Sequence, residues 1–461
     1  MSDAGQETRG NWGSKVAFIF AASGSAIGLG SIWRFPLFVG QNGGAVFVFA
    51  YILAVIFIGF TVMLAELTIG RHAQRNPVGA YNFIKPKSQW KLLGYMGVVS
   101  GVFILAYYSV VAGWAAGYFY KTIAGAFNKL GSMSPDAAWT SADTTFKEFA
   151  ANPVAVLICL FVIIFLTSYV ISKGVKGGIE RWSKILMPFL FVLIIFLAIR
   201  ALTLPGAKTG ISFFINPDFS KFTPKIILFA VGQAFFSLSL GMGTMMTYGS
   251  YISKKDNLVS STGWVCFSTT LIAILAGFIV FPTLFATPGV STETFQPDMG
   301  LMYQVLPITI SKIPGGYIFG ILFFALLLIA ALTSSISMLE VPTAYLVDER
   351  KWSRKRAAIG IGIMAFFLGI PSALSNGAVG FLTKFKLMAK MDLIFGNIGL
   401  AVGGFLICIF LVYSWKMSNA LKEIALGNSN FWLRPFWIFC IRFVAPLAVL
   451  VVLAFIILGI N

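Results

Sequence analysis

Two hydrophobic segments of the chain are interrupted by glycine and serine, at residues 23–31 (SGSAIGLGS) and at residues 237–244 (SLSLGMGT). A helix that breaks leaves free C=O groups at the end of its first half and free N–H groups at the start of its second half. Each break therefore offers a cation site beside an anion site. In the first segment, residues 23–27 would present the carbonyls, while Gly28 and Gly30 would let another group approach the amides that follow.

Other polar chemistry is sparse. The single histidine, His72, lies beside Arg71 at the end of an apolar run, and the four cysteines fall inside apolar runs without metal-ligand spacing. A histidine-dependent triad or metal site in these runs is therefore excluded, and an enzyme is disfavoured because no buried nucleophile has a matched base. Close helix packing by small residues is the alternative reading of the glycine clusters. A dinucleotide-binding loop would need a βαβ unit, which is absent from the sequence pattern.

The elements that position the two breaks are membrane helices. Of the 461 residues, 58% are hydrophobic and 11% are charged, and the mean hydropathy is +0.87. This leaves too little polar surface to cover a soluble globule of this size, so the main solvent is a lipid bilayer. We expect about eleven spans of roughly 20 residues. Their approximate centres are Phe20, Ile56, Leu105, Val162, Phe191, Phe229, Ala273, Leu327, Met364, Leu400 and Leu450.

The two breaks fall in the first and the sixth of these spans. Irregular backbone at membrane depth occurs where it lines a cavity or binds a ligand, so two such breaks indicate a transporter. Because five spans separate equivalent positions, the second set of five enters the membrane in the opposite direction. We therefore expect an all-α membrane protein with a single transporter domain over residues 1–461. It is a 5+5 inverted repeat, with repeats at about 12–203 and 222–413 and an extra helix at about 433–459.

The net charge of +18 comes from 34 basic and 16 acidic residues. The basic residues gather in short loops that follow even-numbered spans, as at residues 71–91, 173–184 and 350–356. This asymmetry predicts a multi-pass protein of the plasma (cytoplasmic) membrane with its N-terminus in the cytoplasm, and not a nucleic-acid-binding protein. One predicted outer loop, at residues 384–390, carries lysines against this rule. No obligate protein partner is evident.

Four stretches of the sequence resemble a known family of transporters. They are NWGSKVAFIFAASGSAIGLGSIWRFP, QNGGAVFVFAY, GQAFFSLSLGMGT and ALTSSISMLE. In these stretches the chain is similar to the neurotransmitter:sodium symporter family, in its bacterial amino-acid branch, from about Arg9 to the tenth span. The resemblance implies sodium-coupled uptake of an amino acid by alternating access.

The resemblance implies two Na⁺ sites. The second maps onto the backbone oxygens of Gly24, Ile27 and Ala330, and its remaining ligands are the hydroxyls of Thr333 and Ser334. Sodium is a hard cation, and an oxygen cage can replace its water. Without the resemblance, such hydroxyls are more simply explained by hydrogen bonds to carbonyls of their own helix.

The first Na⁺ site maps onto the Ala26 carbonyl, Ser31, Ser237 and a residue of the seventh span, and the substrate carboxylate completes it. Bacterial relatives usually have Asn in place of Ser31. In the seventh span this chain has Ser268 or Thr269 where the family has Asn or Asp, and we assign Thr269 as the ligand. This span contains no carboxylate. Chloride is therefore a candidate for the missing negative charge, and a proton bound elsewhere is the alternative.

The position of Gly28 bears on the substrate. Monoamine carriers of the family have an aspartate there, and glycine leaves room for a substrate that brings its own carboxylate. The pocket has no charged residue and its methionines adapt to varied shapes, so we predict a neutral, hydrophobic or aromatic amino acid. The predicted substrate contacts are Ala26, Gly28, Gly30, Ile104, Tyr108, Phe236, Ser237, Ser239, Met242, Ser334 and Met338.

The resemblance also implies two gates. The outer gate maps onto Arg34 and Asp392. The inner gate maps onto Arg9, Asp348, Trp12 and Tyr251. Without the resemblance, either charged pair is equally well explained as a structural salt bridge or an interfacial anchor.

Two further features of the apolar runs concern movement and protons. Gly178 and Pro188 give the pattern glycine, nine residues, proline, which could let the fifth span unwind and open a water path to the second Na⁺ site; a simple proline kink is the alternative. Glu66 and Glu340 are acids in apolar helices, which we interpret as partners of loop amides or serine hydroxyls rather than as proton carriers. An ion channel and a non-transporting amino-acid sensor on the same fold remain alternative functions.

Overall fold

The computed structural model describes residues 10–286, 301–427 and 431–458. Within these ranges, nine helices are long and apolar enough to cross a membrane. They span Ala45–Ala73, Lys91–Ile123, Pro153–Ser172, Val175–Leu202, Leu258–Phe285, Gly316–Arg350, Arg354–Leu374, Gly380–Ser414 and Arg434–Ile456. Together with the two broken spans described below, they account for all eleven predicted centres.

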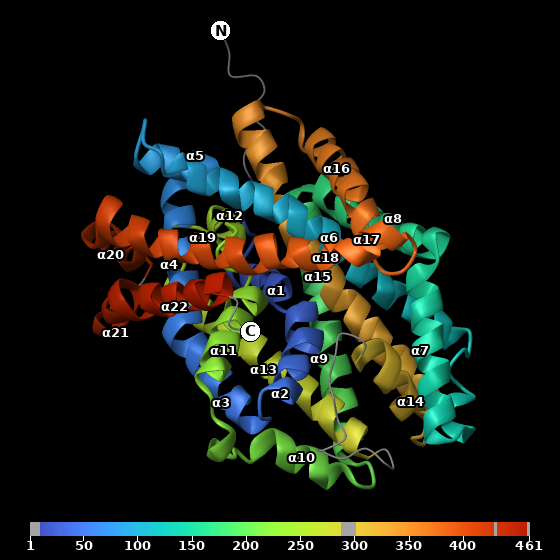
Figure 1. Ribbon diagram of the computed structural model, residues 1–461. Helices are drawn as coiled ribbons and strands as arrows, with labels where there is room; N and C mark the ends of the chain where they lie inside the picture. Colours follow the sequence, from blue (N-terminus) through green and yellow to red (C-terminus); the bar gives the residue numbers. More distant parts are fainter. Residues whose placement is uncertain (1–9, 287–300, 428–430, 459–461) are drawn as a thin grey trace.

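Figure 1 labels the helices within these spans. They are α3 (Ala45–Ala54), α4 (Phe60–Ala73), α6 (Lys91–Ile123), α8 (Pro153–Ser172), α9 (Arg181–Leu202), α13 (Leu258–Phe285), α15 (Gly316–Arg350), α16 (Arg354–Leu374), α17 (Gly380–Phe385), α18 (Leu387–Met391), α19 (Leu400–Ile409), α21 (Arg434–Phe439) and α22 (Ala445–Leu458). Shorter helices connect the spans. They are α5 (Pro77–Ile84), α7 (Pro135–Ala151), α10 (Ala207–Ile215), α14 (Leu306–Ser311) and α20 (Met417–Ala425).

The first span is broken as predicted. Helix α1 (Lys15–Ala26) ends before Ile27, and the chain continues as a π-helical turn at Gly30–Arg34 followed by α2 (Phe35–Gln41). The two halves are bent by 53°. The glycines and serines of the sequence therefore interrupt the helix instead of only packing it closely.

The sixth span is broken as well. Helix α11 (Pro224–Ser237) ends at the predicted position, and α12 (Thr244–Gly249) resumes the helix. Between them the backbone of Ser239 and Gly241 has positive φ, at 54° and 87°. A Cβ on Gly241 would collide with the Leu400 carbonyl of α19, so the close approach of the two backbones requires glycine.

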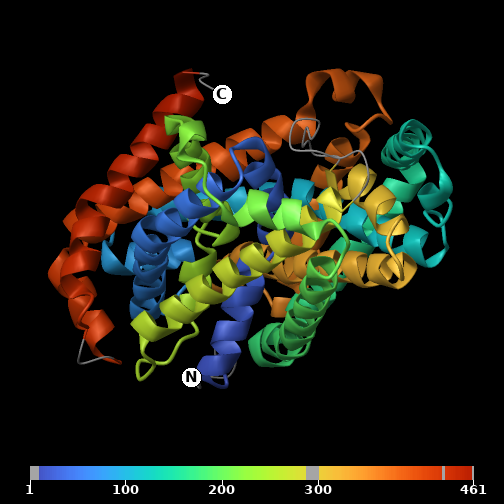
Figure 2. The ribbon, with the colours of Figure 1, turned by 90° about the horizontal axis from the view of Figure 1, so that it is seen from below.

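The broken spans lie inside the bundle. Helix α1 packs against α13, α15 and α9, and α15 packs along α6. Figures 1 and 2 show α7 and α8 at one edge of the molecule and α20, α21 and α22 at the opposite edge. The apolar part of Lys91–Ile123 is 83% buried in protein, compared with 39% for Val175–Leu202. Helix α6 is thus an interior helix, whereas α9 has a wide apolar face for lipid.

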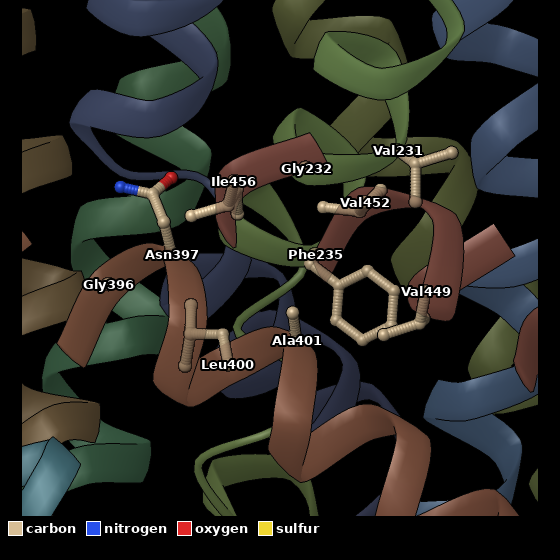
Figure 3. A pocket seen from close by; sticks show the side chains of 10 residues that line it. All are labelled: Val231, Gly232, Phe235, Gly396, Asn397, Leu400, Ala401, Val449, Val452 and Ile456. Carbon is tan, nitrogen blue, oxygen red and sulfur yellow. The ribbon is translucent and has the colours of Figure 1, made fainter. Parts of the chain in front are cut away.

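The last span, α21 with α22, lies against the outer side of α11 and α19. A small cavity of about 30 Å³ remains between these helices. Figure 3 shows its lining, which is apolar except for the amide of Asn397. The extra helix of the predicted architecture therefore covers the second broken span. The residue limits of the two predicted repeats stay a prediction.

A buried group of charges fastens α20 to the end of α4. The Glu423 carboxylate accepts hydrogen bonds from Arg71 Nε (2.8 Å) and Lys254 Nζ (3.1 Å). It also contacts His72 Nδ1 at 3.0 Å. Burial alone would raise the pKa of this carboxyl. The hydrogen bonds with His72 and Lys254 and the charge of Arg71 outweigh burial and lower the pKa from 4.5 to about 2.

We predict that Glu423→Gln destabilises the folded protein at neutral pH. A carboxylate whose pKa is depressed by folding contributes stability above its ordinary pKa of 4.5 and loses that contribution as the pH falls towards about 2. The loss at neutral pH should be about 1.5 kcal/mol, because glutamine keeps one acceptor. Thermal unfolding of both proteins from neutral pH down to about pH 3 checks this. An equally steep decline of the melting temperature in both would contradict it.

Candidate functional site

The two breaks meet at a group of buried serines. Ser25 in the first break donates a hydrogen bond to Ser337 of α15 at 2.7 Å. Its carbonyl accepts hydrogen bonds from Ser239 in the second break (3.1 Å) and from Ser334 of α15 (2.9 Å). Ser25 was not among the predicted site residues, although its place inside the first predicted break was a signal. It joins the three elements that form the centre of the site.

Gly28 lies where α6 and α15 approach the first break. A Cβ at this position would collide with Ser334 Oγ and would stand 2.7 Å from the Tyr108 hydroxyl. Tyr108 accepts a hydrogen bond from the Leu29 amide at 3.0 Å. A methyl group would not fit here, so the close contact of the first break with these two hydroxyls requires glycine.

The predicted substrate contacts come from four elements that pack together: the first break, α6, the second break and α15. Phe236 is partly buried. All the others are buried, namely Ala26, Gly28, Gly30, Ile104, Tyr108, Ser237, Ser239, Met242, Ser334 and Met338. The ring of Phe236 lies over Gly30, where a Cβ would stand 2.8 Å from Cδ1. These residues form an uncharged site that is closed to solvent.

The oxygens predicted for the second Na⁺ site lie at the contact of α1 and α15. A Cβ on Gly24 would stand 3.4 Å from Cβ of Thr333 and 3.1 Å from Sδ of Met187 in α9. The Thr333 hydroxyl donates to the Ala330 carbonyl of its own helix at 3.0 Å, and its oxygen lone pairs remain available to a cation. All predicted metal ligands are buried. They are Gly24, Ala26, Ile27, Ser31, Ser237, Thr269, Ala330, Thr333 and Ser334.

The predicted ligands of the first Na⁺ site are only partly joined. The Ser31 hydroxyl donates to the Ala26 carbonyl at 3.3 Å, so these two ligands face each other across the first break. The hydroxyl of Thr269 donates at 2.8 Å to the carbonyl of Val265 in its own helix, α13. Because the hydroxyl is the donor in this bond, its oxygen lone pairs remain available to a cation.

Two polar side chains beside this site were missed by the sequence reasoning. The Tyr51 hydroxyl lies 3.0 Å from the Ser237 hydroxyl. Gln233 donates to the Gly30 carbonyl at 2.7 Å, and its Oε1 is buried without a hydrogen-bond partner in the described part of the chain. Polar residues in the middle of apolar spans were the available signal.

Glu66 has the loop amides that the sequence suggested as partners, whereas Glu340 contacts a tyrosine hydroxyl and an arginine instead of loop amides or serine hydroxyls. Fully buried in α4, Glu66 accepts hydrogen bonds from the amides of Gly241 (2.7 Å) and Met246 (3.3 Å) in the second broken span. Glu340 accepts a hydrogen bond from the Tyr251 hydroxyl at 2.7 Å and pairs with Arg354. Glu66 thus supplies acceptors for backbone N–H groups that a continuous helix would have satisfied.

At the predicted outer gate, Asn397 lies between Arg34 and Asp392. Arg34 Nη2 donates to Asn397 Oδ1 at 2.9 Å, and Asn397 Nδ2 donates to Asp392 Oδ2 at 3.1 Å. The Tyr107 hydroxyl also donates to Asp392, at 2.8 Å. The guanidinium of Arg34 stands 4.3 Å from the ring centroid of Phe236. In the described chain Arg34 and Asp392 are therefore linked through an amide and not by a direct ion pair.

At the inner gate, the start of the chain is held against the second broken span. Trp12 Nε1 donates to the Tyr248 carbonyl at 3.0 Å, and the Trp12 amide donates to the Tyr251 carbonyl at 3.2 Å. Asp348 accepts a hydrogen bond from the Asn76 amide at 2.9 Å. Arg9 lies outside the described residues, so its part in the gate stays a prediction.

The predicted unwinding segment is helical in this structure. Gly178 lies in the π-helical turn Val175–Glu180, and Pro188 lies inside α9. A Cβ on Gly178 would collide with the carbonyl of Val170 at the end of α8, so close backbone approach explains this glycine. Unwinding of the turn remains a prediction.

Glu180 links this turn to the start of the chain. Its Oε2 accepts a hydrogen bond from the Gly13 amide at 2.8 Å, and its Oε1 pairs with Lys184 at 2.6 Å. We predict that Glu180→Gln, which weakens the bond to Gly13, speeds hydrogen exchange of the chain start and of the turn about fivefold, as expected for a loss of about 1 kcal/mol. Exchange measured by mass spectrometry checks this. The exposed Lys176 of the same turn supplies the control, Lys176→Gln, and equal exchange in the two variants would contradict the prediction.

The model of the sodium:neurotransmitter symporter family matches residues 9–141 and 140–461. The chain belongs to this family. It is 37% identical over 449 residues to the uncharacterized sodium-dependent transporter YhdH of Bacillus subtilis, with 96% of each chain covered. It is 36% identical to an uncharacterized sodium-dependent transporter of Haemophilus influenzae, with 96% of this chain and 97% of the relative covered.

Among solved structures, this family member is similar to the crystal structure of MhsT in complex with L-phenylalanine. The TM-score is 0.86 at 43% identity, and the match covers 97% of this chain and 99% of MhsT. These findings confirm the predicted family and the all-α fold with broken first and sixth spans. The protein is a multi-pass, sodium-dependent membrane transporter and not an enzyme.

Proposed function

We propose that this transporter carries a neutral hydrophobic or aromatic amino acid into the cell together with Na⁺, by alternating access. The observation that carries the proposal is the closed, uncharged site around Gly28. A substrate there meets the hydroxyls of Tyr108 and Ser334 beside the exposed backbone of the break. The methionines Met242 and Met338 belong to the same set of buried residues. A carboxylate fits the polar end and an apolar side chain fits the rest.

The binding of L-phenylalanine by MhsT supports the same substrate class, because MhsT shares 43% identity and the fold with this chain. We further propose two Na⁺ sites at the predicted ligands. The substrate carboxylate would complete the first site, so Na⁺ and the amino acid would each raise the affinity for the other. The plasma membrane is the proposed location, with the N-terminus on the cytoplasmic side.

Chloride is a proposed additional ion. The first Na⁺ site has neutral protein ligands, and the buried hydroxyl of Tyr51 lies 3.0 Å from the hydroxyl of one of them, Ser237. An anion in this region would balance the charge of the cation once the substrate has left. Uptake that is unchanged when gluconate replaces chloride would remove chloride from the proposal and leave a bound proton as the alternative.

Uptake of radiolabelled amino acids into proteoliposomes tests the function. With an imposed Na⁺ gradient, we expect accumulation that is competed by hydrophobic and aromatic amino acids and not by glutamate or lysine. Equilibration of the amino acid across the membrane that does not depend on the Na⁺ gradient, with fluxes far above carrier turnover, would point to a channel. Binding without uptake would point to a sensor. Strong competition by glutamate or lysine would overturn the substrate class alone.

A further inference from the structure

A groove of about 610 Å³ lies between the ends of α6 and α7 and the start of α8. Its apolar wall includes Ala155, Ile158 and Val162 of α8. The side chains of Ile158 and Val162 are 57% and 39% exposed. Figure 1 shows α7 and α8 at the edge of the molecule, so this wall faces the surrounding membrane.

The groove reaches the level of the lipid headgroups. Helix α7 is a polar helix between two membrane spans, so it lies outside the hydrocarbon layer, and its last turn forms one rim of the groove. Tyr120, on the opposite rim, is 72% exposed. Tyrosines of this kind are enriched at the boundary between headgroups and acyl chains. A lipid in the groove would therefore place its headgroup at the rim and an acyl chain along α8.

The rim carries one positive and one negative side chain, Lys121 and Glu148. Neither side chain forms an ion pair within the described part of the chain. Other surface charges do, for example Lys147 with Asp143. The Lys121 ammonium stands 5.6 Å from the ring centroid of Phe149, which holds it at the rim. Two other surface grooves of about 530 Å³ each have no charged lining residue.

We propose that this groove binds a phospholipid whose headgroup contains a phosphate and a primary ammonium, as in phosphatidylethanolamine. Lys121 binds the phosphate and Glu148 binds the ammonium, so both charges of the rim are matched. An anionic headgroup without an ammonium leaves the Glu148 carboxylate facing a like charge. A quaternary ammonium matches the charge but offers no N–H donor to the carboxylate.

Native mass spectrometry of the purified protein tests this proposal. The probes are phosphatidylethanolamine, phosphatidylglycerol and phosphatidylcholine with identical acyl chains. We expect phosphatidylethanolamine to be retained about fivefold better than the other two, which corresponds to about 1 kcal/mol for the contact of its ammonium with Glu148. Glu148→Gln should remove this advantage, and Lys121→Gln should lower the retention of all three lipids, because each of them contains a phosphate.

Two further variants separate the groove from general surface charge. Lys147→Gln removes a positive charge from α7, the helix that carries Glu148, at a side chain that is 71% exposed and lies outside the groove lining, and it should change nothing. Ala155→Phe fills the groove without a change of charge and should reduce retention of phosphatidylethanolamine. Equal retention of the three lipids, or a Lys121→Gln variant that behaves like the parent protein, would overturn the proposal. Because lipid retention is measured without amino-acid uptake, this result is independent of the proposed function.

Discussion

Replacing Glu66 by alanine is expected to abolish Na⁺-driven amino-acid uptake. The carboxylate accepts hydrogen bonds from the amides of Gly241 and Met246, and it is fully buried. Alanine leaves two buried N–H groups without an acceptor, each at a cost of about 1–3 kcal/mol. The second break would lose the geometry that presents Ser239 to the site. We expect uptake to fall at least about 100-fold, which corresponds to about 2.8 kcal/mol.

Glu66→Gln distinguishes the structural role from a proton-carrying role. Glutamine keeps one acceptor for Gly241, so we expect an intermediate loss of uptake with the same dependence on external pH. A proton carrier would instead lose its pH dependence in this variant. Initial rates of uptake into proteoliposomes, measured at several external pH values, give both the loss of uptake and its pH dependence. The rates are normalised to the amount of folded protein, measured by size-exclusion chromatography. Full uptake by the Glu66→Ala variant would contradict the assignment.

Replacing Tyr108 by phenylalanine is expected to reduce uptake about 10- to 100-fold, or about 1.4–2.8 kcal/mol. The hydroxyl accepts a hydrogen bond from the Leu29 amide at 3.0 Å and borders the space beside Gly28. Phenylalanine leaves that buried amide unsatisfied and removes the proposed donor to the substrate carboxylate. The apparent affinity for the amino acid should therefore fall together with the rate.

Tyr118 on the same helix, α6, provides a matched control for this substitution. Its hydroxyl is buried and has no hydrogen-bond partner among the described residues. Tyr118→Phe removes the same atom without breaking a hydrogen bond, and uptake should stay close to that of the parent protein. If the two variants lost uptake equally, the effect would belong to packing of α6 and not to the site.

The two breaks could be predicted because their signal is local. Glycine and serine in the middle of an apolar run contradict both the helix pattern and the membrane environment, and the structure ends α1 at Ala26 and α11 at Ser237. Gly28 could be singled out for the same reason. The identity of each ligand atom came from the family resemblance, since spacing alone does not say which carbonyl or hydroxyl turns inward.

Pairings between distant residues could not be predicted in this way. Arg71 and Glu423 are 352 positions apart, and nothing in their local sequence indicates that one will bury its charge against the other. Asn397 is a single amide in an apolar stretch, and its role depends on how the span containing α19 packs beside the first break. Such partners are set by tertiary packing, which propensity and periodicity do not encode.

The amide link at the outer gate has a kinetic consequence. Asn397 holds Arg34 with its oxygen and Asp392 with its nitrogen, so one rotation about its terminal torsion breaks both side-chain bonds together. Rotations of exposed side chains take picoseconds to nanoseconds, and Asn397 is partly exposed. We therefore expect this link to break and re-form many times within one transport cycle. The slower step is then expected at the opposite end, where the hydrogen bonds of both Trp12 and Glu180 have to break.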